Sequence, residues 1–202
     1  MRVFVSVFLW FVLFGVLSAV CKNAIDNRYP SKSEISKMEI KELLDKYLTW
    51  TSFDPSKKSF IADEENPYHK PLLEKGKLVA EYVSKNKEQY TLNGKLNLHL
   101  VWILGEIADP SSFDILLTNY LASPDYRLAI SLAACTTKDN IEKVVSSLDD
   151  KSLFEFMKVI LSEEEFNQIN SKNKTEIIEF WQKNYDSIQK KVIARTIPMP
   201  MG

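Results

Sequence analysis

Apolar residues recur at helical spacing along the middle of the chain, residues 96–135. Between residues 96 and 108 they fall three, four or seven positions apart, which predicts a helix with a wide buried face. A second helical pattern spans residues 113–121, and a third begins after Ser123-Pro124. Isolated helices of about three turns are marginal in water. We therefore expect these helices to stabilise one another by packing.

Two short motifs mark the joints between these patterns, Asp109-Pro110 and Ser123-Pro124. Proline cannot continue a helix, but it is well tolerated at the first helical position, where its missing N–H would be unpaired anyway. Asp109 is placed to be an N-cap that accepts hydrogen bonds from the first turn. Ser123-Pro124 repeats this cap-plus-proline arrangement, so the sequence predicts a new helix after each joint.

The residues from Trp102 to Pro110, the following helix and the residues from Asp125 to Ala133 resemble the HEAT-like repeats, especially their short variety. Leu104 and Leu132 take equivalent positions at an offset of 28 residues. The resemblance is confined to residues 96–135 and implies an architecture, with little about activity. It implies structural roles for Leu104, Gly105, Asp109, Pro110, Arg127 and Leu132. The second copy departs from the first, because no Asp-Pro pair follows it.

The flanking segments are also predicted to be helical. Ser36 and Glu39 suggest a capping box for a helix that reaches Leu48, and residues 51–70 read as a loop. Pro71 is expected to open a helix ending near Asn86, and Asn93-Gly94 is expected to form a turn. Further helices are predicted at 139–148, 151–161, 163–170 and 174–194. The last has an apolar stripe and is expected to close the stack: Ile177, Trp181, Tyr185, Ile188 and Val192.

The N-terminal segment predicts export. Residues 3–20 carry no charge and follow Arg2, as in a secretory signal cut after Ser18 or Ala19. The run is also just long enough to remain as a membrane anchor, and Cys21 offers a lipid-anchor alternative. The expected organisation is therefore a signal or anchor over 1–20, a linker over 21–33, an all-α domain over 34–196 and an extended tail over 197–202. We expect the domain to be a short irregular α-solenoid of HEAT-like hairpins.

Charge and composition exclude several kinds of site. The chain of 202 residues has 26 basic and 27 acidic residues, which argues against nucleic acid, since phosphate binding needs a basic surface. Zinc sites need three or four ligands at recognisable spacing, and the two histidines, His69 and His99, belong to no such set. No cofactor motif is present either. Cys135 lies on an apolar face, which favours a buried small residue over a nucleophile. Trp50, Trp102 and Trp181 lie at core spacings.

We expect a non-enzymatic interaction module whose partner is another protein or a peptide. Its partner contacts are assigned to Asp114, Thr118 and Asn119, which fall opposite or beside the apolar face of the second central helix. The alternative is an enzyme or small-ligand binder with a site between helices near His99 and Glu106, which share a helical face. A purely structural envelope component is a third interpretation.

Overall fold

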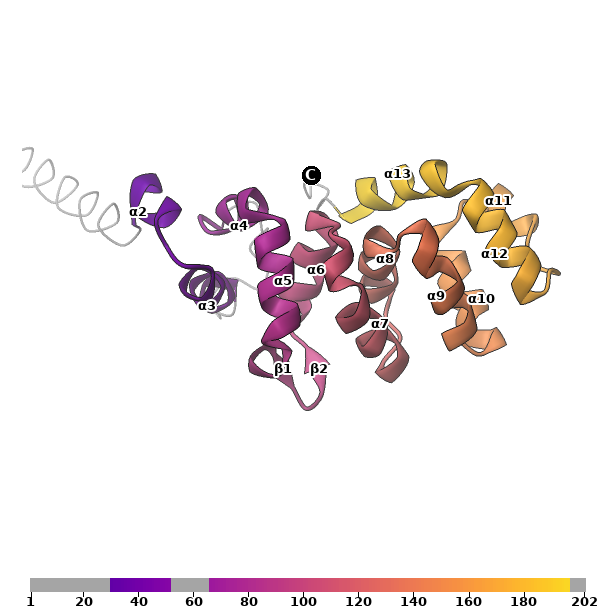
Figure 1. Ribbon diagram of the computed structural model, residues 1–202, viewed down its shortest axis with the longest axis horizontal. Coiled ribbons are helices and arrows are strands. Elements are labelled where there is room, and N and C mark those ends of the chain that lie inside the picture. Colours follow the sequence, from indigo (N-terminus) through magenta and orange to yellow (C-terminus); the bar gives the residue numbers. More distant parts are fainter. Residues whose placement is uncertain (1–29, 52–65, 197–202) are drawn as a thin grey trace, which may run out of the picture. The chain divides into compact units, whose positions relative to one another are not determined.

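The described part of the chain is mostly helical (Figure 1). The computed structural model describes residues 30–51 and 66–196, which contain one short β-hairpin besides helices. The predicted all-α class is confirmed for these residues. The predicted leader, the Cys21 anchor, most of the predicted loop and the C-terminal tail lie outside them.

The chain divides into two units, Met1–Glu39 and Ile40–Gly202. The described part of the first unit holds helix α2, Lys32–Ser36, which starts inside the predicted linker. Ser31 is its N-cap and forms a capping box with Glu34, whose carboxylate accepts from the Ser31 backbone N–H at 2.7 Å. The predicted capping box at Ser36 is wrong, because Ser36 is the last residue of α2 and its hydroxyl donates to the Ser33 carbonyl at 3.0 Å.

The second unit contains the remaining elements. Its first part comprises α3 (Ile40–Thr51), α4 (His69–Lys75), α5 (Lys77–Lys85), η2 (Lys87–Tyr90), β1 (Thr91–Leu92), β2 (Lys95–Leu96), α6 (Leu98–Ile107) and η3 (Pro110–Ser112). Its second part comprises α7 (Phe113–Ala122), α8 (Tyr126–Cys135), η4 (Lys138–Asn140), α9 (Ile141–Ser147), α10 (Asp150–Ile160), α11 (Glu163–Asn167), α12 (Lys174–Lys183) and α13 (Tyr185–Thr196).

Helix α8 forms the centre of the core. Every residue from Leu128 to Cys135 is buried. The helix packs against α6, α7, α10 and α13, so it has neighbours on all sides. A helix that is apolar all round is stable in water only when it is enclosed in this way.

Three successive elements recur at a constant offset. Helices α8, η4 and α9 begin 28 residues after α6, η3 and α7 respectively. The N-caps correspond as well: Asn97 accepts from the His99 N–H at 2.9 Å, and Asp125 accepts from the Arg127 N–H at 2.8 Å. The offset first seen between Leu104 and Leu132 thus applies to whole elements and to their capping chemistry.

The two predicted joints have different outcomes. Asp109 caps η3 as predicted, because its Oδ1 accepts from the Ser111 N–H at 2.9 Å, and Pro110 follows it in the first turn. The cap predicted at Ser123 is wrong. Asp125 caps α8 instead, so Pro124 precedes the cap, and the aspartate carboxylate satisfies the first turn.

Two predicted helices are each split. The helix expected over 71–86 begins at His69 and breaks at Gly76, whose φ of 38° is accessible to glycine. The helix expected over 174–194 breaks at Asn184, whose side-chain N–H donates to the Phe180 carbonyl at 2.9 Å. The apolar stripe continues across this break, since Trp181 and Ile188 are both fully buried. Hydrophobic spacing alone therefore did not reveal the second break.

The first central helix begins at Leu98, two residues later than predicted. Residues Lys95 and Leu96 pair with Leu92 and Thr91 across a two-residue turn. Both turn residues, Asn93 and Gly94, have positive φ, as hairpin turns of this length require. The turn predicted there is confirmed.

Candidate functional site

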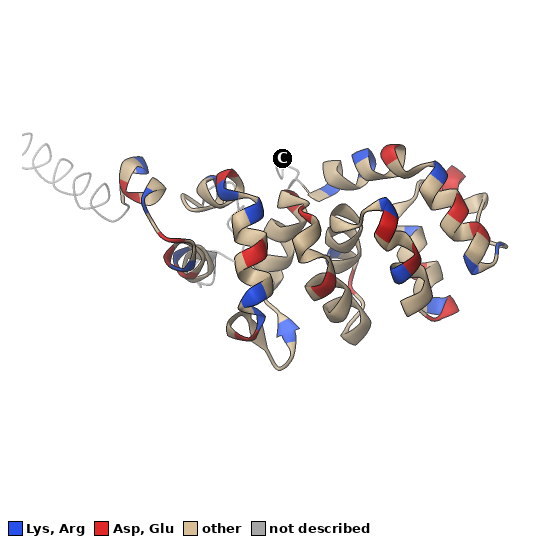
Figure 2. Cartoon of the chain, viewed as in Figure 1, with Lys and Arg blue, Asp and Glu red and all other residues tan. Residues whose placement is uncertain are grey.

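The exposed side of α7 carries two of the three residues assigned to partner contacts. Asp114 and Thr118 are exposed, and the Thr118 hydroxyl donates to the Asp114 carbonyl at 2.8 Å. The Asp114 carboxylate pairs with Lys143 of α9 at 2.7 Å. Figure 2 shows an acidic residue in red on α7 and charged residues of both signs on α9. This pair joins the surfaces of α7 and α9.

Asn119 has a different position from the one predicted. Its side chain is buried: Oδ1 accepts from the Leu96 N–H at 2.7 Å, and its N–H donates to the Ile115 carbonyl at 2.8 Å. Asn119 thus joins the hairpin to α7 and is not available as an exposed contact residue. The helical pattern of α7 could not show that a strand N–H would need an acceptor at this position.

The 28-residue offset extends the exposed surface onto α9. At this offset Glu142 corresponds to Asp114 and Ser146 corresponds to Thr118. All four residues are exposed. We call these four residues the α7–α9 face. Its carboxylates and hydroxyls repeat in the same order on the two helices.

Most of the residues predicted to have structural roles lie in the core or at its edge, whereas Pro110 is exposed. Leu104 and Leu132 are fully buried, and Gly105 lies where α6 meets α8. The Arg127 guanidinium lies 5.3 Å from the ring centre of Trp102, a cation–π contact between α8 and α6. Among the tryptophans placed in the core by their spacing, Trp181 is fully buried, whereas Trp102 and Trp50 are half-buried.

Glu106 pairs with His69, whereas the histidine that shares its helical face is His99. His69 of α4 lies with Nε2 at 2.9 Å from Oε2 of Glu106 in α6. Both side chains are largely buried, at 8% and 14% exposure, and the Tyr47 ring lies beside the imidazole at 6.0 Å between centres. The pair therefore connects α4 to α6 beneath α3. The described residues contain no group of three or more side chains suited to holding a metal.

Cys135 is buried at the end of α8. Its thiol donates to the Leu104 carbonyl at 3.5 Å, and burial raises its pKa well above the usual value. The thiolate that a nucleophile requires is thereby disfavoured. This agrees with the interpretation of Cys135 as a small buried residue.

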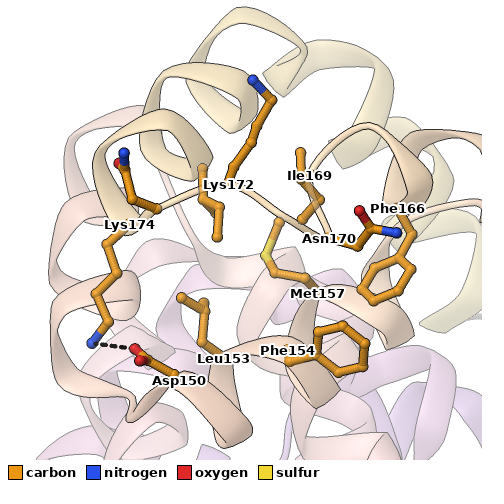
Figure 3. Close-up of a pocket in the computed structure, with 11 residues that line it drawn as sticks. Asp150, Leu153, Phe154, Met157, Phe166, Ile169, Asn170, Lys172 and Lys174 are labelled. Carbon is orange, nitrogen blue, oxygen red and sulfur yellow. Dashed lines mark ion pairs between the residues drawn. The ribbon is translucent and has the colours of Figure 1, made fainter.

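A hollow of about 450 Å³ lies between α10, α11 and α12 (Figure 3). Leu153, Met157 and Ile169 contribute apolar side chains to it, and Lys174 pairs with Asp150 at its edge at 3.8 Å. The residues that line it include no histidine, cysteine or serine. The charged and amide side chains of its lining are Asp150, Asn170, Lys172, Asn173 and Lys174.

Comparisons of this chain with protein-family models, curated proteins and solved structures gave no match. Among the helices of the described residues, none combines the length and apolar character needed to cross a bilayer.

Proposed function

We propose that this chain is a non-enzymatic protein–protein interaction module, built as a short irregular α-solenoid of HEAT-like hairpins. The recurrence of α6, η3 and α7 as α8, η4 and α9 at 28 residues carries the proposal. Units of equal length that bury their apolar sides against one another are characteristic of repeat arrays, and such arrays bind proteins along their surfaces. The partner is another protein or a peptide.

The α7–α9 face is the proposed contact surface. Asp114 and Glu142 present carboxylates at equivalent positions, and Thr118 and Ser146 present hydroxyls one turn further along. A repeating set of acceptors fits an extended partner with cationic or donor groups at matching intervals. Lys143 is held by Asp114 at the surface, where ion pairs are weak, so a partner cation can replace it at little cost.

The test compares two double variants with equal changes of charge. Asp114→Arg with Thr118→Arg alters the face, while Thr175→Arg with Glu179→Arg alters exposed positions on α12. Proteins crosslinked to the tagged chain in the cells that produce it are then quantified. We expect a set of proteins captured by the wild type and the α12 variant and lost from the α7 variant. Equal capture by both folded variants would remove this face from the proposal.

Export is part of the same proposal, with residues 1–20 as a cleaved signal, a retained anchor or the leader before a lipidated Cys21. The uncharged run at 3–20 supports it, because so apolar a segment requires removal or a bilayer. Intact mass of the purified protein separates the three forms. A full-length chain recovered from the soluble cytoplasm would contradict all of them.

A further inference from the structure

Exposed apolar side chains gather at one end of the second unit. Seven large apolar side chains are exposed within the described residues. Four of them belong to the hairpin or to the adjoining helix ends: Leu92 (78% exposed), Tyr126 (56%), Leu121 (47%) and Leu98 (39%). We call these four residues the hairpin-end patch. Concentration of apolar exposure at one place marks an interaction site more reliably than scattered single residues do.

Several contacts bring the members of this patch together. Lys95 of β2 lies with Nζ at 3.2 Å from the hydroxyl of Ser123, which connects α7 to α8. Leu98 and Tyr126 are the first residues of α6 and α8, which pack side by side, and Leu121 lies in the last turn of α7. The hairpin and the connection between α7 and α8 accordingly lie at the same end, the lower one in Figure 1.

The surroundings of the patch carry a positive excess. Lys85, Lys87 and Lys95 are exposed on the end of α5, on η2 and on β2. Figure 2 shows basic residues in blue at the end of α5 and on β2. Together with Arg127 they outnumber the two acidic residues of the same segments, Glu88 and Asp125. Lysine is depleted at protein–protein interfaces, whereas apolar tips surrounded by lysines suit a negatively charged lipid surface.

We propose that the hairpin-end patch docks on an anionic lipid surface. Leu92, beside the tip of the hairpin, enters the boundary between headgroups and acyl chains, and Tyr126 follows with its ring in the interfacial region. Lys87 and Lys95 contact lipid phosphates, to which the surface potential attracts them. This docking is independent of the proposed protein partner, because the α7–α9 face does not include any patch residue.

Docking is tested in the full chain with a fluorophore attached within the patch. The label must be local, because an anchored leader would hold the protein on any vesicle. Leu92→Cys, in a Cys21→Ser background, receives an environment-sensitive fluorophore and is mixed with phosphatidylcholine vesicles with or without 30% phosphatidylglycerol. Leu78→Cys is the matched control, since Leu78 is also exposed but lies near the other end of α5. We expect a blue shift for the label at residue 92 on anionic vesicles only, weakened by added salt.

Charge reversal supplies the second arm. Lys87→Glu with Lys95→Glu should raise the lipid concentration needed for half of the shift by roughly tenfold or more. Lys183→Glu with Lys190→Glu, at exposed positions of α12 and α13, should leave it unchanged. Equal shifts at residues 92 and 78, or equal shifts on neutral and anionic vesicles, would overturn the proposal. A shift that grows with protein concentration without lipid would also overturn it, in favour of a second copy of the chain.

Discussion

Gly105 of α6 lies against Ser131 of α8, so closely that a Cβ at residue 105 would fall 2.7 Å from the Ser131 Cβ and 2.9 Å from its Cα. Real Cβ atoms do not approach other atoms to such distances. The close packing of α6 on α8 at this point thus depends on having a glycine on one helix and a small residue on the other.

Gly105→Ala should destabilise the protein, although glycine-to-alanine changes inside helices usually stabilise by about 0.5–1 kcal/mol. The added methyl group meets backbone-bound atoms that cannot rotate away, and overpacking of this kind costs roughly 1–3 kcal/mol. Urea unfolding measures the difference. Adding Ser131→Gly should recover part of the loss. A Gly105→Ala variant more stable than the wild type would contradict the close approach.

Leu104→Ala and Leu132→Ala should each lower the free energy of unfolding by about 2–5 kcal/mol, because both side chains are fully buried. Equal burial at equivalent positions is what the 28-residue alignment requires. Leu78→Ala is the control, since a leucine with 59% exposure should lose no more than about 0.5 kcal/mol. A melting temperature close to that of the wild type for either core variant would contradict the 28-residue alignment.

The pair formed by His69 and Glu106 should couple α4 to α6. Glu106→Ala leaves a buried imidazole nitrogen without its partner and should cost about 1–3 kcal/mol. In a double-mutant cycle with His69→Ala, the double variant should lose less stability than the sum of the two single variants. The exposed pair of Lys77 and Glu81 serves for comparison and should couple by no more than about 0.5 kcal/mol. Additive losses at His69 and Glu106 would show that the contact is not formed.

Glu165 should make stability depend on pH. Burial alone would raise the pKa of its carboxyl, but Lys191 at 2.6 Å and the two donors of Ser162 outweigh burial and lower the pKa below 4.5. A carboxylate whose pKa is lower in the folded protein than in the unfolded chain stabilises the fold at pH values above its unfolded pKa. This contribution is lost as the pH falls through the folded pKa. Glu165→Gln should therefore be less stable than the wild type near neutral pH.

The deficit of Glu165→Gln should shrink as pH falls below 4.5, the ordinary value for this group. Thermal melts of both proteins over a pH series measure it. Glu163→Gln, at an exposed position in the same helix, is the control for the substitution itself. A deficit that stays constant down to the acid limit would contradict the role of the ionised carboxylate.

Local features of the structure were the ones that could be predicted from the sequence. Asp109 caps a helix start through a neighbour two residues away, and Trp181 and Ile188 belong to a stripe whose spacing is visible in the sequence. The residues between Leu104 and Leu132 also repeat at a visible offset, so helix content and the central packing followed from spacing.

Features that depend on long-range contacts could not be predicted. His69 meets Glu106 across 37 positions, and no local motif encodes that distance. Asn119 became a buried acceptor because a strand 23 residues earlier presents its N–H there. For the candidate site, periodicity correctly predicted that Asp114 and Thr118 are exposed. It could not show that a side chain of a neighbouring helix would pair with one of them.

Helix α13 is the last element of the described chain to be synthesised, yet it packs on α6 and α8. Its Tyr185 and Gln189 side chains donate to the Thr136 and Ala134 carbonyls at the end of α8, and Arg195 donates to the Val159 carbonyl near the end of α10. A nascent chain that has not yet released α13 from the ribosome leaves these carbonyls without donors and the central helix partly uncovered. Completion of the core therefore waits for the synthesis of α13, and premature termination before Tyr185 produces a substrate for chaperones and proteases.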